Sequence, residues 1–349
     1  MSTSSDTVMQ ALAYPFDRDL AAMPDGGRIL LANALPGAGP WAPARTSVWQ
    51  WWKGPAAAFE GGGFTLVHGD LTNDAGADEK FNAVLLRLPR QREEAQFVMS
   101  SAWQVLAPGG LFMAAAANDA GGARLEKDLK PFLPGLQNAS KHKCRIVWAR
   151  KEAQALPQEW ITRGHLQKHG EPGIWTRPGL FSWDRVDVAT GLLLPFLPTG
   201  LKGAVADLGC GTGVIANHVL KHNPDVALML CLDADVRAVE ACRKNLAERH
   251  AGRNIDYHWV DLGQQIPPAQ KFPLVDTVIM NPPFHAEKTL AIALGQAFIR
   301  NAAAFLKTGG SLWMVANAHL PYEPILQQTF KAVEKVHEGR GFKIIRAVK

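Results

Sequence analysis

The fold of the second half of this chain is decided by residues 204–213, Ala204-Val205-Ala206-Asp207-Leu208-Gly209-Cys210-Gly211-Thr212-Gly213. An apolar run ends in a carboxylate, three glycines follow at alternate positions, and a helical pattern begins at Val214. A buried strand, a glycine-rich turn and a helix open an α/β unit, and ligands bind at such strand-to-helix turns. The stretch therefore predicts a parallel sheet with a ligand site at the carboxyl end of one strand.

The residues that follow continue the alternation of strands and helices. A continuous apolar run at 226–232 is typical of a buried parallel strand, and a helical pattern returns at 236–249. Further strands are expected at 257–261, 276–280, 311–316 and 342–348, with a helix near 290–306. This spacing predicts a doubly wound, Rossmann-like α/β sheet.

The spacing of the glycines separates the turn from a dinucleotide site. Nicotinamide enzymes carry G-x-G-x-x-G, which holds a pyrophosphate at the helix N-terminus, whereas this turn reads G-x-G-x-G after a carboxylate. Glycines lack a Cβ atom, so their backbone can approach a ligand closely. The pattern suits a ligand with a cationic amino-acid end and no phosphate, as in S-adenosylmethionine (SAM). We expect SAM to contact Asp207, Gly209, Cys210, Gly211 and Gly213.

Two later strands end in carboxylates that suit the nucleoside part of SAM. Asp233, followed by Ala234, can accept hydrogen bonds from both ribose hydroxyls. The alternative is an N-cap, because either Asp233 or Asp235 can cap the helix that follows. Asp261 can accept from the adenine amino group while Leu262 packs on the ring; its alternative role is to cap a loop.

The tetrapeptide Asn281-Pro282-Pro283-Phe284 follows the fourth strand and points to a reaction. An amino group conjugated to a purine is a poor nucleophile, because its lone pair is delocalised into the ring. The Asn281 amide oxygen, which also faces the cofactor, and the Pro282 carbonyl can accept its two hydrogens. The prolines hold this backbone rigidly, and Phe284 offers a face for a stacked base. His285 is expected to line the pocket; the alternative is a Pro-Pro strand end with a buried phenylalanine.

The first half repeats part of this plan without its chemistry. Residues 81–89 align with 275–283, and residues 107–113 align with 307–313. Leu31 stands at the position of Asp207, and no glycine-rich turn follows it. We interpret the chain as two tandem methyltransferase-like domains of which the first is degenerate; chance similarity of two α/β units is the alternative.

Positive charge gathers between these halves. Residues 141–177 hold eight lysines and arginines against three glutamates, an excess equal to the +5 of the whole chain. Clustered cations are typical of nucleic-acid binders, although a solvated linker is equally consistent. We expect Lys141, Lys143 and Arg145 to contact the substrate, and we divide the chain into a degenerate domain at 1–150, a basic connector at 151–178 and a catalytic domain at 179–349.

Bulk composition sets further limits. The chain has 47% hydrophobic and 20% charged residues, and it shows neither an apolar run long enough to span a bilayer nor a recognisable signal peptide. The four cysteines form no CxxC pair, which favours a reducing cytoplasm, and the histidines show no metal-ligand spacing. We expect a cytoplasmic protein without a metal or a membrane partner, and a monomer, although little in the sequence bears on oligomeric state.

The motifs together resemble the ribosomal RNA small-subunit guanine-N(2) methyltransferases and their large-subunit relatives. The residues that carry the resemblance are 178–182 (Pro-Gly-Leu-Phe-Ser), Asp187, 207–211, 281–285, 315–322 and 342–344. The resemblance implies SAM as donor and a guanine of ribosomal RNA, chiefly 16S rRNA, as acceptor. It assigns Gly209, Gly211 and Asp233 to the cofactor, Asn281 through Phe284 to the reaction and Phe181 to the substrate, and gives the first half a part in folding and RNA docking.

Other readings stay open at this point. The tetrapeptide also serves enzymes that methylate adenine amino groups or a glutamine side chain, and a large-subunit guanine is a second target. A protein of another class, a non-catalytic SAM-binding or RNA-binding assembly factor, has no use for a rigid clamp on an amino group. The sequence does not identify the modified guanine, or decide between free rRNA and an assembled subunit.

Overall fold

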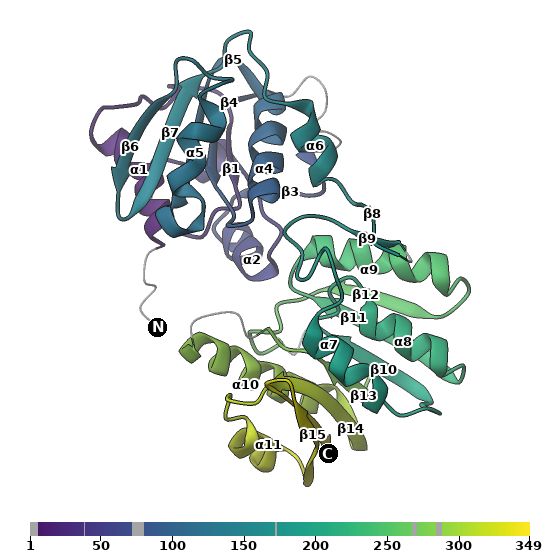
Figure 1. Ribbon diagram of the computed structural model, residues 1–349. Helices are drawn as coiled ribbons and strands as arrows, with labels where there is room; N and C mark the ends of the chain where they lie inside the picture. Colours follow the sequence, from purple (N-terminus) through teal and green to yellow (C-terminus); the bar gives the residue numbers. More distant parts are fainter. Residues whose placement is uncertain (1–5, 38, 72–79, 172, 267–270, 284–287) are drawn as a thin grey trace. The chain divides into compact units, whose positions relative to one another are not determined.

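A computed structural model describes residues 6–37, 39–71, 80–171, 173–266, 271–283 and 288–349. The chain divides into two compact units (Figure 1). The first unit comprises Met1–His165 and Arg177–Gly179, and the second comprises Leu166–Thr176 and Leu180–Lys349.

The centre of the second unit is a seven-stranded sheet of order β12-β11-β10-β13-β14-β16-β15 among the described residues. Strands β10 to β14 run parallel, β16 is antiparallel to β14, and β15 is antiparallel to β16. The strands are β10 Gly203–Leu208, β11 Val226–Asp233, β12 Ile255–Trp259, β13 Val275–Met280, β14 Leu306–Asn317, β15 Ala332–Gly339 and β16 Phe342–Val348. The helices are α7 Val188–Leu193, η3 Leu194–Phe196, α8 Val214–His222, α9 Val236–Arg249, α10 Lys288–Phe305 and α11 Glu323–Thr329, and a separate hairpin joins β8 Gln167–His169 to β9 Ile174–Thr176.

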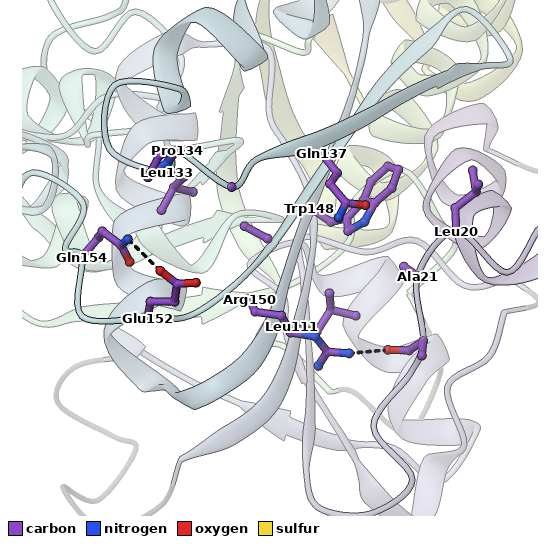
Figure 2. Close-up of a pocket in the computed structure, with 13 residues that line it drawn as sticks. Leu20, Ala21, Leu111, Leu133, Pro134, Gln137, Trp148, Arg150, Glu152 and Gln154 are labelled. Carbon is purple, nitrogen blue, oxygen red and sulfur yellow. Dashed lines mark hydrogen bonds between the residues drawn. The ribbon is translucent and has the colours of Figure 1, made fainter.

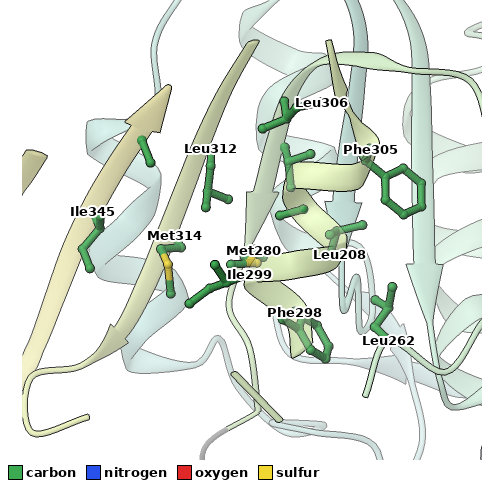
Figure 3. Packing of buried hydrophobic residues seen from close by; sticks show 14 of the residues in the cluster. Leu208, Leu262, Met280, Phe298, Ile299, Phe305, Leu306, Leu312, Met314 and Ile345 are labelled. Carbon is green, nitrogen blue, oxygen red and sulfur yellow. The ribbon is translucent and has the colours of Figure 1, made fainter. Parts of the chain in front are cut away.

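Side chains that alternate along β10 supply the two apolar faces of this sheet. Val205 packs in a cluster with residues of α7, α8 and α9, among them Leu193, Ile215 and Leu246. Ala206 and Leu208 pack on the other face, in a cluster with residues of α10 and α11. Figure 3 shows part of this second cluster, including Leu208, Met280, Phe298, Ile299 and Met314. Helices on both faces confirm the predicted doubly wound fold.

The first unit has the same sheet order, β3-β2-β1-β4-β5-β7-β6, and the same strand directions. Its strands are β1 Ile29–Ala32, β2 Thr46–Trp49, β3 Thr65–Val67, β4 Phe81–Arg87, β5 Leu106–Ala117, β6 Gln137–Lys141 and β7 Cys144–Arg150. Its helices are α1 Thr7–Asp17, η1 Pro43–Arg45, α2 Lys53–Gly61, α4 Arg92–Val105, η2 Asn118–Ala120, α5 Gly122–Leu129 and α6 Gln158–Gly164.

The repeat extends to single contacts. Gly27 and Gly203 hold positive φ at the start of the first strand of their units, and a Cβ atom would collide with Asn82 or Asp276. Each of those side chains accepts a hydrogen bond from the amide after the glycine, over 3.0 Å in the first unit and 2.9 Å in the second.

The last strands repeat in the same way. The Nζ atom of Lys151 donates to the carbonyl of Leu106 over 2.8 Å, and that of Lys349 donates to the carbonyl of Leu306 over 2.7 Å. Shared strand order and shared contacts confirm the predicted tandem arrangement.

Some boundaries differ from the expected ones. The connector expected at 151–178 is divided: α6 packs against α4 of the first unit, whereas β9 packs against α9 of the second. Strand β12 begins two residues before the expected 257, and strand β15 was not expected, because its alternation of polar and apolar residues is weak.

Candidate active site in the second unit

The glycine-rich turn forms the floor of the candidate site. Gly209, Gly211 and Gly213 all have positive φ, of 79°, 51° and 85°, which other residues adopt only with strain. The Gly209 amide donates to the carbonyl of Leu232 over 2.8 Å, so the turn is fixed against the end of β11. Helix α8 starts directly after Gly213, and the turn therefore presents backbone at a helix N-terminus.

A pocket in the second unit brings this turn together with Asn281, the first residue of the tetrapeptide. Its lining includes predicted cofactor residues, the predicted substrate residue Phe181 and four residues ahead of the sheet that the sequence analysis did not assign to the site. The lining residues are Phe181, Ser182, Arg185, Asp187, Thr190, Gly209, Cys210, Gly211, Thr212, Val214, Ile215 and Asn281. Phe181 is 50% exposed, which suits contact with a ligand.

Asp233 is tied to the turn by its carboxylate. The side chain accepts from the amides of Gly211 and Asp235, each over 2.9 Å. Burial raises the pKa of Asp233 to about 6, although these amide hydrogen bonds act to lower it. Asp235 caps helix α9 by accepting from the amide of Arg237, so the capping role falls on Asp235, and contact of Asp233 with ribose stays a prediction. Ala234 lies between them and accepts from Trp259 through its carbonyl.

The residues expected at the adenine end have mainly structural contacts here. Asp261 accepts from the amide of Gly263 over 2.9 Å, which is the loop-capping role considered above. Leu262 is only 1% exposed and belongs to the core cluster. Contact of either residue with adenine stays a prediction.

Asp207 is fully buried at the end of β10 and does not line the pocket. One carboxylate oxygen accepts from the amide of Ala216 in α8 over 3.2 Å, and the other accepts no hydrogen bond from any described residue. Burial raises the pKa of Asp207 to about 7, because the charged form loses its hydration. The carboxylate therefore stabilises the first turn of α8 through the Ala216 amide.

Asn281 carries the clearest chemical signal in the pocket. Its Nδ2 atom donates to Oδ2 of Asp187 and to Oγ1 of Thr190, each over 2.9 Å. Its Oδ1 atom is buried and accepts no hydrogen bond from the described part of the chain. Pro282 is buried and Pro283 is exposed, while Phe284 and His285 lie outside the described residues. A buried acceptor without a donor costs roughly 1–3 kcal/mol, so such groups usually have a function.

Asp187 and Thr190 were missed as site residues by sequence reasoning, although Asp187 contributed to the family resemblance. Asp187 caps α7 by accepting from the Thr190 amide over 2.8 Å. The Asp-x-x-Thr pattern ahead of an apolar run is a cap signature that could have located α7. It could not have shown that the cap meets Asn281, which is 94 residues further along the chain.

The first unit carries different residues at three equivalent positions of this site. Asn33 occupies the place of Gly209: it has φ of 52°, and its amide donates to the carbonyl of Trp49 over 2.8 Å. Gln50 replaces Asp233 and is 3% exposed, with its amide group donating to Ala34 and accepting from the Trp52 amide. Arg87 stands where the second unit has Asn281. These replacements explain why the first domain is degenerate.

The first unit has a pocket of its own at another place. Figure 2 shows Leu20, Gln137 and Trp148 around it, with Arg150 donating to the carbonyl of Ala22 over 3.1 Å. It contains none of the predicted site residues. Lys141 ends β6, Lys143 lies in the turn and Arg145 lies in β7, so these three cations belong to the first unit.

Two negative findings concern the described residues. They contain no group of three or more metal-ligating side chains. The described helices also include none with the length and apolar character needed to cross a membrane.

Comparison with known proteins matches this two-unit architecture. A family model described as Methyltransferase small domain matches residues 171–346, and one described as Methyltransferase small domain N-terminal matches residues 43–163. A T. thermophilus 16S rRNA N2 methyltransferase, solved in complex with AdoMet and guanosine, has a TM-score of 0.78 and 23% identity over 100% of this chain and 93% of that chain, which supports the same fold.

Curated relatives extend the match in sequence. The ribosomal RNA small subunit methyltransferase C of Salmonella arizonae is 33% identical over 74% of this chain and 73% of its own length. The protein of the same name from Escherichia coli K12 is 32% identical over 82% of this chain and 79% of its own length. The chain therefore belongs to the ribosomal RNA small subunit methyltransferase C family.

Proposed function

We propose that this protein transfers the methyl group of SAM to the exocyclic N2 amino group of a guanine in small-subunit, 16S ribosomal RNA. The observation that carries the proposal is the buried Asn281 Oδ1 atom, an acceptor without a donor, in one pocket with the glycine-rich turn. The names of the relatives favour the small subunit over the large one. The bound AdoMet and guanosine of the T. thermophilus protein support the donor and the base.

The residues present fit SAM. The turn at Gly209 and Gly211 offers backbone without side chains, and the Asp233 carboxylate at the next strand end suits ribose hydroxyls. When bound, SAM supplies a methyl group on a positively charged sulfur. The Asp233 carboxylate, whose pKa burial raises only to about 6, is mostly ionised at neutral pH and favours a cationic ligand.

The protein's own contribution to the reaction is positioning and polarisation. Asn281 Oδ1 and the Pro282 carbonyl are expected to accept the two hydrogens of the target amino group, which returns electron density to its nitrogen. Pro282 has a fixed φ and restricts the residue before it, so the two acceptors keep their spacing. Transfer needs no covalent link to the protein, and holding the two reactants in line supplies most of the acceleration.

The first unit is proposed to dock rRNA. Lys141 and Lys143 are exposed on the β6–β7 turn, and both cations suit phosphate contact. Functionally, we retain the division into a docking domain at 1–150, a connector at 151–178 and a catalytic domain at 179–349. We also propose a monomer in the cytoplasm, where the four free cysteines stay reduced.

The test uses radiolabelled SAM with purified small subunits, large subunits, naked 16S rRNA and release factor. Nucleoside mass spectrometry of the labelled product is expected to show N2-methylguanosine in small-subunit rRNA. Label in an adenine, in large-subunit RNA or in a glutamine side chain would replace the proposed substrate by that one. Binding of SAM and RNA without any transfer would indicate an assembly factor.

A further inference from the structure

The N-cap of α7 holds the catalytic amide. Asp187 Oδ2 accepts from the Thr190 amide over 2.8 Å and from Asn281 Nδ2 over 2.9 Å. Thr190 is buried, and its hydroxyl oxygen accepts the second hydrogen of Asn281 Nδ2 over 2.9 Å. Both hydrogens of the Asn281 amide are therefore used by one short helix start.

This arrangement fixes the polarity of the amide. An asparagine side chain has nearly the same shape when its oxygen and nitrogen are exchanged, so the hydrogen-bond network decides its orientation. An ionised carboxylate can only accept, and a flipped Asn281 would place oxygen against oxygen at Asp187. The flip would also turn a donor toward the target amino group, which needs an acceptor. Only one of the two orientations can therefore support the reaction.

The first unit retains the link with a different partner. Asp6 caps α1 by accepting from the amides of Val8 and Met9, each over 3.0 Å. The same carboxylate pairs with Arg87, over 2.9 Å to Nη2 and 3.2 Å to Nε. Arg87 and Asn281 occupy equivalent positions. Arg87 comes directly after the last β4 residue that pairs with β1, and Asn281 comes directly after the last β13 residue that pairs with β10.

The two units share the capping contact and differ in the group that it holds. In both, a helix-capping aspartate holds the residue directly after the last pair between the first strand of the unit and the strand beside it. In the first unit the held group is a guanidinium, which has donors only and no polarity to set. In the second unit the held group is an amide, and the equivalent carboxylate, Asp187, also orients it.

We infer that Asp187, assisted by Thr190, is a positioning residue that keeps Asn281 Oδ1 directed at the substrate amino group. The inference rests on the proposed function in one respect, that Asn281 accepts from that amino group. It extends the reaction machinery to the segment ahead of the sheet.

The first test reads the amide without any activity assay. The side-chain ¹H–¹⁵N pair of Asn281, assigned by its loss in Asn281→Ala, is recorded in wild-type protein, Asp187→Asn and Asp6→Asn. Asp187→Asn keeps a good N-cap but lets the facing amide donate or accept. We expect a large shift of this pair in Asp187→Asn and none in Asp6→Asn. An unchanged pair in Asp187→Asn would overturn the inference, whatever the natural substrate.

The second test is kinetic and uses whichever substrate the wild-type protein methylates. Asp187→Asn is expected to lower kcat by roughly tenfold or more, with the Kd of SAM within about twofold of wild type. In an Asn281→Ala background the same change is expected to have no further effect on the residual rate, because the residue it orients is gone. Asp6→Asn, the equivalent cap in the first unit, is expected to keep the wild-type kcat below its melting temperature.

Two results of the kinetic test would contradict the positioning role. Additive losses in the double variant would mean that Asp187 acts independently of Asn281. A loss of SAM affinity with unchanged kcat would make Asp187 a cofactor contact. Absence of N2-methylguanosine in the wild-type reaction is a separate result. It would contradict the proposed substrate, whereas the NMR shift of the Asn281 amide would still test the positioning role of Asp187.

Discussion

At the scale of single residues, the site depends on buried polar groups whose hydrogen bonds are incomplete. Asn281 Oδ1 and one oxygen of Asp207 are both buried and accept nothing from the described residues. Such atoms destabilise the folded chain, so each calls for an explanation. Asn281 lines the pocket, where a ligand can supply the missing donor, whereas Asp207 lies outside the pocket and supports the start of α8.

Asn281→Ala should separate binding from transfer. The alanine removes the acceptor for the target amino group but leaves the glycine-rich turn and Asp233 in place. We expect kcat to fall by about 100-fold or more, with the Kd of SAM from calorimetry close to wild type. A parallel loss of SAM affinity would show that Asn281 supports the cofactor site instead.

Asp207→Asn should change the pH dependence of stability. The folded pKa of Asp207 is raised to about 7 from the unfolded value of 3.8, so folding favours the protonated form. Its stability contribution is present below pH 4 and is lost as the pH rises toward 7, by on the order of 4 kcal/mol. The variant is therefore expected to gain stability relative to wild type between pH 4 and pH 8, measured by urea unfolding without SAM. A difference that does not vary with pH would contradict the raised pKa.

At the scale of elements, the glycine-rich turn is shaped by backbone conformation and by close packing. Gly213 has φ of 85°, and a Cβ atom would lie 2.8 Å from Cys242 Sγ in α9. Gly309, in the turn within β14, has a similar φ of 80° but open space around a Cβ atom. An alanine at either position would therefore have the same unfavourable φ, but only at position 213 would it also collide with Cys242.

Replacement of each glycine by alanine isolates that contact. Gly309→Ala is expected to lower the free energy of unfolding by about 1–2 kcal/mol from the left-handed conformation. Gly213→Ala should cost more, because α8 and α9 must also move apart. Thermal unfolding of both variants measures the difference; equal costs would show that α9 yields without penalty.

At the scale of the whole molecule, one fold is used twice with different chemistry. The second unit keeps the turn, the strand-end carboxylate and the amide clamp, while the first replaces them with Asn33, Gln50 and Arg87. The two units therefore share a scaffold, in strand order and in single contacts, and differ in the residues at the site. The proposed role of the first unit is to bind rRNA through its exposed cations.

Substitution of Lys141, Lys143 and Arg145 by alanine tests that contribution. We expect weaker rRNA binding and a salt slope reduced by about 2, since each phosphate contact accounts for roughly 0.7–0.9 of the slope. Arg145 should contribute least, because it already bonds to Asn138 and lies 3.9 Å from Glu126. The matched control replaces three ion-paired lysines of the second unit, Lys202, Lys307 and Lys335. Filter binding across a salt series measures both; equal effects would refute a specific docking role.

Features that depend only on neighbouring residues can be predicted from the amino-acid sequence. Residues 204–213 predict a strand end followed by a glycine-rich turn, and residues 281–284 predict a rigid Pro-Pro segment. Each of these features is set by residues next to one another in the chain. The match of residues 81–89 to residues 275–283 is also visible in the sequence. It predicts the tandem arrangement and the absence of the Asn-Pro-Pro-Phe tetrapeptide from the first unit.

Contacts between residues far apart in the chain could not be predicted and depend on how the elements pack. The Asp187 cap and Asn281 are far apart in sequence, and their contact requires α7 to start at the carboxyl end of β13. Burial likewise decided that Asp207 supports the turn from below and that Asn281 keeps an oxygen without a donor. Burial and hydrogen-bond satisfaction are properties of the packed fold, so no pattern of neighbouring residues could have shown them.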